Sequence, residues 1–220
     1  MPVTTTPYTH EMVIIHRVFR RESALLPRLV AEVRPADVSR AGRIAEAVRE
    51  YAGGLHHHHH LEDELIWPKL YARARLYDEL VTRMEMQHQR LGDTLRAIDE
   101  ALPPFANSAD PASRAALGEA LTEHRCALIE HLDDEERQVL PLIADHLTID
   151  EWDEVGRRGL ETIPRSKVML ALGAILEDAD DEEQRYFLGK APAAGRMLWK
   201  LVGRRQYRQY VAELRGTGPA

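Results

Sequence analysis

Apolar residues recur along most of this chain at the three- and four-residue spacing of an α-helix. No stretch of useful length alternates between apolar and polar positions as a β-strand does. The pattern predicts four long helices joined by short connections, at about residues 7–33, 37–73, 77–102 and 110–146. Long helices with short connections favour an all-α fold, an antiparallel up-down four-helix bundle.

Capping and helix-breaking residues set the expected ends of these helices. Thr6 as N-cap and Pro7 at the first helical position begin the first helix, and Pro27 is expected to kink it or end it early. Glycines at 53–54 form a weak point in the second helix. The stretch PPFANSADPAS at 103–113 is expected to end the third helix.

The pattern changes from about Thr148 onward, where the predicted helices are shorter. We therefore expect a bundle domain at 1–147 and a C-terminal helical appendage at 148–220 that packs on it. Residues 185–220 hold eight Lys and Arg and one acid, and aromatic residues that include Trp199, Tyr207 and Tyr210 lie between them. This composition suits either a membrane surface or other anionic partner, or an amphipathic helix docked on the acidic bundle, and the second is favoured.

Composition narrows the function classes. A net charge of −7 argues against nucleic acid as a partner, and no apolar run is long enough to span a membrane. Charges interrupt the only apolar stretch near the N-terminus, so we expect no signal peptide. Cys126 is the only cysteine, which excludes an intrachain disulfide and fits a reducing, cytoplasmic compartment. Monomer and homodimer both remain open.

A repeat in the second and fourth predicted helices carries the candidate chemistry. Residues 58–68 (HHHLEDELIWP) align with residues 131–141 (HLDDEERQVLP) at an offset of 73, which pairs His58 with His131 and Glu62 with Glu135. In each segment the histidine precedes the glutamate by four residues, so both side chains lie on one helix face. The repeat implies two helical hairpins related by a pseudo-two-fold axis that brings equivalent residues together at the bundle centre.

The first and third helices add one inward histidine each, His16 and His88, at an offset of 72. Four imidazoles and two carboxylates from four helices suit two iron or manganese ions bridged by the carboxylates, and zinc is also compatible with such ligands. Six buried polar groups without partners would be too costly to be incidental. The predicted metal ligands are His16, His58, Glu62, His88, His131 and Glu135.

Two neighbouring residues compete for places in this set. The run of five histidines at 56–60 points all round its helix, so at most two of them face inward. The repeat selects His58 and leaves His59 as the second choice, and Glu136 competes with Glu135 in the same way. Tyr51 and His124, two turns before His58 and His131, are expected to serve mainly in packing.

The four motifs together resemble the hemerythrin-like, HHE cation-binding domain over about residues 8–147. They are HRVFRRE led by His16, HHHHHLEDELIWP, MEMQHQRL and HLDDEERQVLP. The resemblance implies a four-helix bundle with a non-haem, oxo-bridged di-iron centre that meets O2, peroxide or NO. Carried over by position, it implies the same six ligands as the repeat.

This sequence departs from the oxygen-carrying hemerythrins at two positions. Those proteins have a second histidine one turn before the third-helix ligand, where this chain has Met84. Their fourth-helix carboxylate is an aspartate five residues after its histidine, whereas the repeat here favours Glu135 at four. Without this histidine, we expect a centre closer to two imidazoles on each of the two ions, with more open coordination positions. A tyrosine, another histidine or water could instead fill the gap.

Open coordination positions favour redox turnover over reversible binding. We therefore expect a cytoplasmic di-iron protein with a catalase- or peroxidase-like activity or an NO-scavenging one. The alternatives are a non-catalytic protein that binds or senses O2 or NO, with the C-terminal helices relaying the metal state, and a protein that handles iron. The sequence assigns no catalytic residue beyond the metal ligands.

Overall fold

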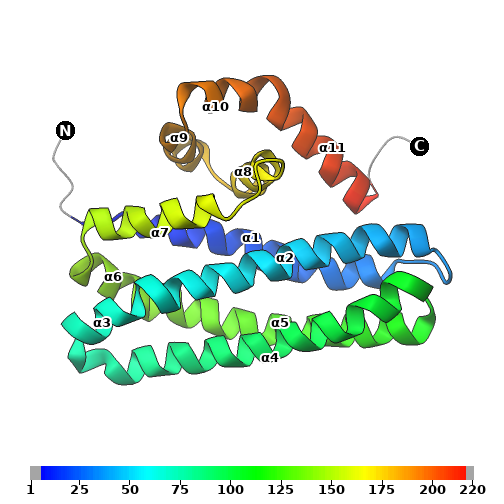
Figure 1. The fold of residues 1–220 in the computed structure, drawn as a ribbon, viewed down its shortest axis with the longest axis horizontal. Helices are drawn as coiled ribbons and strands as arrows, with labels where there is room; N and C mark the ends of the chain where they lie inside the picture. The colour runs from blue at the N-terminus through cyan, green and yellow to red at the C-terminus, as the bar shows by residue number, and fades with distance from the viewer. Residues whose placement is uncertain (1–5, 217–220) are drawn as a thin grey trace.

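The structure is a computed structural model that describes residues 6–216, and it contains no strand within that range. Four long helices run antiparallel along the long axis of the molecule (Figure 1). They are α1 (His10–Ala31), α2 (Val38–Leu65), α4 (Asp78–Ser108) and α5 (Pro111–Asp134). Helix α1 contacts α2, α2 contacts α4, α4 contacts α5 and α5 contacts α1, which closes the predicted up-down four-helix bundle.

The second and fourth bundle helices continue past a local break. After α2, the chain resumes as α3 (Trp67–Arg73) and reaches α4 through a short 3₁₀ turn, Arg75–Tyr77. After α5, a π-helical turn at Glu135–Val139 leads into α6 (Leu140–His146). Pro68 and Pro141 lie near the starts of α3 and α6, as the repeat predicts, because proline fits a first helical turn whose amides have no partner.

Two of the predicted helix starts are confirmed by their caps. The Asp37 carboxylate accepts a hydrogen bond from the Arg40 amide at 2.9 Å and caps α2. The Asp110 carboxylate accepts from the amides of Ala112 and Ser113 and caps α5. Each cap satisfies amides that a helix start leaves without partners.

The predicted start of the first helix was wrong. Helix α1 begins at His10, after Thr9, so Thr6 is not its N-cap. The Thr9 amide donates to the Pro7 carbonyl at 3.1 Å, which means that the chain still turns at Pro7. Pro27 lies inside α1, which continues for another turn, so this proline does not end the helix.

The third bundle helix is longer than predicted. Helix α4 continues through Pro103 and Pro104 and ends at Ser108, and its C-cap residue Ala109 takes a left-handed conformation with φ of 49°. The carbonyls that lose their donors belong to the exposed residues Asp99 and Glu100, where water can replace the missing amides. Phe105, fully buried in the core, holds the last turn in place.

The core consists of two apolar clusters separated by a polar layer. One cluster fills the end of the bundle near the α1–α2 connection and includes Leu26, Ile44 and Phe105. The other fills the opposite end, around Trp67 and Val139. The buried histidines and glutamates of α1, α2, α4 and α5 lie between them.

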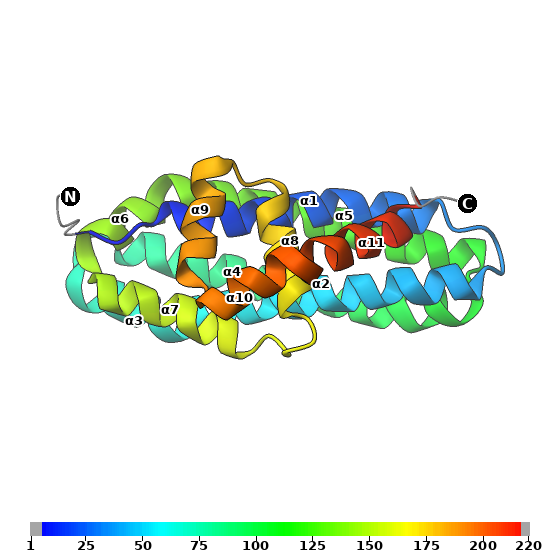
Figure 2. The same ribbon diagram turned by 90° about the horizontal axis from the view of Figure 1, so that it is seen from above.

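Residues beyond the bundle form a layer of shorter helices over α1 and α2 (Figures 1 and 2). Thr148 and Glu151 form a capping box at the start of the first of them. These helices are α7 (Ile149–Glu161), α8 (Val168–Glu177), α9 (Asp181–Lys190), α10 (Ala193–Leu198) and α11 (Arg204–Arg215), with a π-helical turn at Trp199–Gly203. Within residues 6–216, no helix combines the length and apolar character that crossing a membrane requires.

The appendage has its own packing contacts. Helix α7 packs on α2, while the apolar α8 lies between α1 and α11. Gly173 of α8 directly faces the ring of Tyr207 from α11, and a side chain at 173 would overlap that ring. The two helices therefore approach as closely as they do because residue 173 has no side chain. The division of the chain at 147 and 148 remains a prediction.

We expect Gly173→Ala to lower the free energy of unfolding by about 1–3 kcal/mol, because the new methyl group overpacks the α8–α11 contact. Urea unfolding followed by circular dichroism measures the change. Gly54→Ala is the matched control, since Gly54 is also helical but nothing lies within 4 Å of an added Cβ. It should leave stability unchanged or raise it by up to about 1 kcal/mol. Equal effects of both substitutions would contradict the close contact.

Candidate metal centre

Seven titratable side chains converge in the polar layer between the two apolar clusters. Helix α1 provides one of them, α2 three, α4 one, α5 one, and the π-turn after α5 the last. All seven are buried except His58, which is nearly so. They are His16, His58, His59, Glu62, His88, His131 and Glu135.

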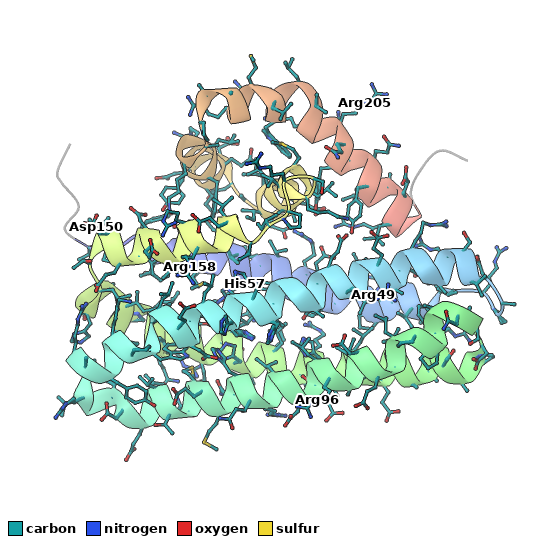
Figure 3. All side chains as sticks on the ribbon, in the orientation of Figure 1. Arg49, His57, Arg96, Asp150, Arg158 and Arg205 are labelled. Carbon is teal, nitrogen blue, oxygen red and sulfur yellow. The ribbon has the colours of Figure 1, made fainter. Side chains whose placement is uncertain are left out.

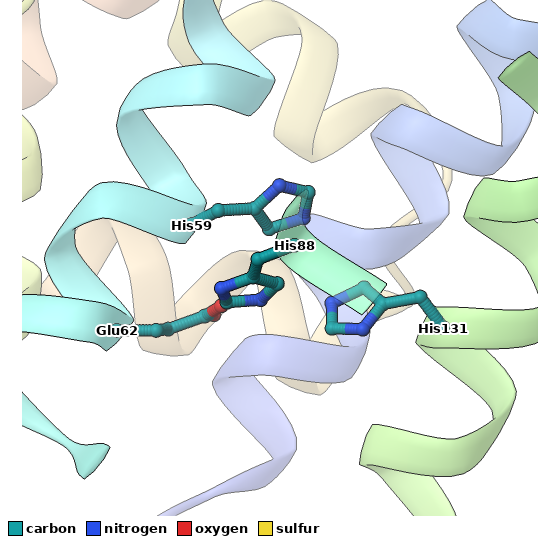
Figure 4. A group of neighbouring side chains, drawn as sticks. All are labelled: His59, Glu62, His88 and His131. Atoms are coloured by element: carbon teal, nitrogen blue, oxygen red, sulfur yellow. The ribbon is translucent and has the colours of Figure 1, made fainter. Parts of the chain in front are cut away.

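The first group combines three imidazoles with one carboxylate (Figure 4). Potential ligand atoms of His59, Glu62, His88 and His131 all lie within 4.8 Å of one another. His59 stacks on His88 with ring centroids 4.4 Å apart, and the His131 ring lies 4.7 Å from that of His88. Three imidazole nitrogens and a carboxylate oxygen at this spacing can hold one metal ion.

The second group combines two imidazoles with two carboxylates, from His16, His58, Glu62 and Glu135. The Nε2 atoms of His16 and His58 face each other at 3.2 Å. Glu135 Oε2 lies 3.4 Å from His16 Nε2 and also 3.6 Å from His131 Nε2 in the first group. This carboxylate therefore reaches both groups.

Glu62 joins the two groups directly. Its Oε1 lies 3.2 Å from His58 Nε2, while its Oε2 lies 3.3 Å from His88 Nε2. The two oxygens of one carboxylate thus face imidazoles of different groups. A carboxylate placed in this way can bridge two metal ions.

The ring nitrogens that face away from the centre are held by a second layer of acceptors. His16 Nδ1 donates to Glu136 at 3.0 Å, and His88 Nδ1 donates to Asp63 at 2.7 Å. His131 Nδ1 donates to the Gln87 side-chain oxygen at 3.2 Å. Holding Nδ1 orients each ring so that Nε2 points into the centre, as metal-binding imidazoles require.

This second layer follows the same internal repeat as the first. Glu136 and Asp63 are 73 residues apart, and they hold the two histidines that the repeat pairs, His16 and His88. Glu136 also accepts from Arg20 at 3.1 Å and lies outside both groups. The structure thus places Glu135 in the centre and Glu136 behind His16.

The atoms in the centre are poorly satisfied by the protein alone. Both carboxylate oxygens of Glu62 and of Glu135 are buried and make no hydrogen bond within residues 6–216. The same is true of the Nε2 atoms of His59, His88 and His131. Burying so many acceptors without partners would cost several kcal/mol in total. The donor set and its geometry therefore fit divalent or trivalent cations bound between these side chains.

Burial and neighbouring charges prepare most of these groups for a metal. Burial lowers the pKa of His58 to about 4 and holds the pKa values of His59 and His131 well below the usual range, so the three rings are neutral at pH 7. Burial opposes ionisation of Glu62, but the nearby imidazoles outweigh it and lower the pKa of Glu62 to about 2. Burial and the Glu62 charge raise the pKa of Glu135 well above its usual value. A cation would stabilise both carboxylates as anions.

All six residues that the sequence analysis selected lie in these two groups, and their assignment as ligands remains a proposal. His59, kept there as a replacement for His58, lies in the centre together with it. It completes a group of three imidazoles, and the other group has two. This differs from the expected arrangement, which has two imidazoles in each group. Met84 is fully buried in the apolar cluster next to the centre. An extra histidine on α2 thus supplies the imidazole that α4 lacks, and the run of five histidines was the signal for it.

A hydrogen-bonded network lies further along the bundle, on the side of the first apolar cluster. The Thr94 hydroxyl donates to the Leu91 carbonyl at 2.9 Å, so it accepts from His124 Nδ1 at 2.8 Å. His124 Nε2 is then free to accept the Tyr51 hydroxyl proton at 2.9 Å. Burial lowers the pKa of His124 to about 4, so its ring is neutral at pH 7. Tyr51 and His124 are equivalent in the repeat, and their contact confirms that the pseudo-two-fold axis brings equivalent residues together.

The model of the hemerythrin HHE cation-binding domain matches residues 8–143, well over half of the chain. The chain therefore belongs to the hemerythrin HHE cation-binding family, and its buried His/Glu groups are able to hold metal. No match was found among curated proteins or among solved structures.

Tyr51→Phe should lower the free energy of unfolding by about 1–3 kcal/mol, because it leaves the buried His124 Nε2 without a donor. Tyr71→Phe is the matched control, since the Tyr71 hydroxyl is also hydrogen-bonded to side chains, Thr82 and Glu85, but near the surface, where water can replace it. The control should change stability by less than about 0.5 kcal/mol. Denaturant unfolding of both variants at pH 7 compares them. A Tyr51→Phe protein as stable as wild type would show that this hydrogen bond contributes nothing.

Proposed function

We propose that this protein is a non-haem di-iron protein that reacts with small oxidants such as H2O2, O2 or NO by redox turnover. The observation that supports this most directly is the position of Glu62, whose two oxygens face different imidazole groups. A single-ion site has no need of two separate groups of donors joined by one carboxylate. Imidazole and carboxylate together suit iron, and manganese or zinc are the competing metals.

Two residue sets would hold the ions. His59, His88 and His131 would hold one ion, and His16 and His58 the other. Glu62 would bridge them, with Glu135 as the second shared carboxylate. When bound, a pair of redox-active ions supplies two electrons to a peroxide or oxygen ligand without a further cofactor.

The unequal division of imidazoles decides where an oxidant would bind. The group of His16 and His58 has one imidazole fewer, so it has room for an external ligand. Glu62 and Glu135 would both act there as anions, because a bound cation favours the charged form of a carboxylate. Phe19 packs against His58 with ring centroids 5.1 Å apart, so an apolar ring borders this group.

Contacts around α1 favour a second candidate, a sensor of O2 or NO. Arg17, the neighbour of His16, forms an ion pair with Glu183 of α9 at 2.8 Å. Arg20 pairs with Glu136, which holds His16 Nδ1. One turn of α1 therefore contacts both the centre and the appendage, so a change at His16 can reach the C-terminal helices. A protein that only handles iron is the third candidate.

His59→Leu should reduce the metal content of the purified protein from two ions per chain to roughly one, because it removes one of three imidazoles from a single ion. Elemental analysis of protein purified without added metal gives both the stoichiometry and the identity of the metal. His60→Leu is the matched control, since His60 belongs to the same histidine run but its side chain is 64% exposed. Equal metal content in the two variants would remove His59 from the ligand set.

The iron-loaded protein should evolve oxygen from added H2O2, and Glu62→Gln should lose at least about 90% of that rate, because a neutral amide bridges two cations poorly. An oxygen electrode measures the rate, and wild-type protein loaded with zinc is the control for chemistry that needs a redox metal. Negligible turnover with a reversible optical change on oxygenation would support the sensor instead. Neither response in protein that holds iron would support iron handling.

A further inference from the structure

The last helix of the chain has an outward face that the metal centre does not explain. Helix α10, the π-turn at Trp199–Gly203 and α11 form one continuous helical segment at residues 193–215. Figure 1 shows α10 at the outer edge of the appendage, on the side away from α4 and α5. Figure 2, viewed from that side, shows α10 and α11 lying over α8 and the bundle.

The inward face of this segment is packed and satisfied. Trp199, Gly203 and Leu214 are buried, and an added side chain at 203 would meet the Trp199 ring and Met169. Tyr207 donates to Glu177 of α8 at 2.6 Å. The segment is therefore firmly docked, and the residues on its other face are exposed because the fold directs them outward.

Four large apolar side chains occupy that outward face and are here called the apolar strip. Their spacing of one, three and four residues places them on one side of the helix. Leu201 is 72% exposed and Met197 is 61% exposed, values far above those of an ordinary core helix. The strip consists of Met197, Leu198, Leu201 and Val202. A contiguous exposed group of this kind marks an interaction surface.

Basic side chains surround the strip and are here called the basic rim. They are Arg196, Lys200, Arg204, Arg205 and Arg208. All five are exposed, and none forms an ion pair with a carboxylate in the part of the chain that the structure describes. Arg205 extends away from the bundle in Figure 3. Segment 193–215 carries six basic residues and one acid, while the whole chain has a net charge of −7.

The charge of the rim restricts what can cover the strip. A second copy of the chain in a two-fold dimer would place five cations opposite five cations, which is unfavourable. Nucleic acid would pair with the rim but would leave four aliphatic side chains against water. A membrane with anionic headgroups satisfies both features, because its interface accepts apolar side chains beside basic ones.

We infer that the outward face of residues 196–208 docks on a lipid surface that carries anionic headgroups. The apolar strip enters the interface, and the basic rim binds the headgroup phosphates.

Vesicle co-sedimentation of the full-length protein tests this docking. Wild-type protein should bind phosphatidylcholine vesicles that contain phosphatidylglycerol, should not bind pure phosphatidylcholine vesicles, and should be released by high salt because salt screens the rim. Arg204→Gln/Arg205→Gln should weaken binding about thirtyfold at low salt, since each basic residue contributes about 1 kcal/mol at an anionic surface. Met197→Ser/Leu201→Ser should weaken it at least about tenfold through lost apolar burial.

A double variant at the opposite end of the molecule is the matched control. Arg75→Gln/Leu76→Ser also removes one exposed arginine without a carboxylate partner and one exposed leucine. Leu76 is 97% exposed. It should bind vesicles as wild type does. So should His59→Leu, because the docking face does not involve the metal centre. Circular dichroism checks that each variant is folded. The rim and strip variants change only exposed side chains, so we expect them to fold as wild type does.

Several outcomes would overturn the inference. Equal binding to neutral and anionic vesicles, or strip and rim variants that bind as wild type does, would show that this face does not meet lipid. A concentration-dependent dimer that Met197→Ser/Leu201→Ser dissociates would assign the face to a second copy of the chain. Binding of duplex DNA that the rim variant abolishes and the strip variant leaves unchanged would assign it to nucleic acid.

Discussion

The fold of this protein depends on how a layer of buried imidazoles and carboxylates is accommodated between two apolar clusters. The side chains come from all four bundle helices, and most of their inward atoms have no partner among the described residues. Without a cation, each buried carboxylate would cost several kcal/mol, and the pair would repel each other. A metal bound in this layer would convert that cost into the interaction that joins α1, α2, α4 and α5.

Duplication of a helical hairpin explains most of this layer. The repeat doubles the His/Glu pairs, the histidines that face them, and the acceptors Asp63 and Glu136 behind those histidines. It also doubles the distortion that follows each glutamate, a break after α2 and a π-turn after α5, and π-turns are frequent at functional sites. The imidazoles themselves become asymmetric at one position, because the counterpart of His59 is the buried Leu132. That single difference divides the imidazoles unequally and makes the two groups of donor side chains chemically distinct.

The C-terminal appendage separates its charges by face. Its inner side meets α1 through paired groups, such as Glu183 with Arg17, and Glu11 with Lys190 at 2.7 Å. Its outer side carries cations without carboxylate partners around exposed aliphatic residues. The two ion pairs lie on α1, the helix that also carries His16. The helices of the appendage therefore lie between the candidate metal centre and the outer surface. If the proposed docking holds, the appendage would keep the candidate metal centre close to the lipid surface.

Much of this structure could be predicted from the sequence alone. Helical periodicity, the Asp37 and Asp110 caps and the 73-residue repeat are local or one-dimensional signals, and they determined the bundle, its symmetry and six residues of the centre. The start of α1 and the passage of α4 through Pro103 and Pro104 could not be predicted, because distant packing and burial of Phe105 outweighed local preferences. Only the tertiary structure could place both His58 and His59 in the centre. Adjacent residues on a helix diverge by about 100°, so both can face the core only where the other helices surround α2 on two sides.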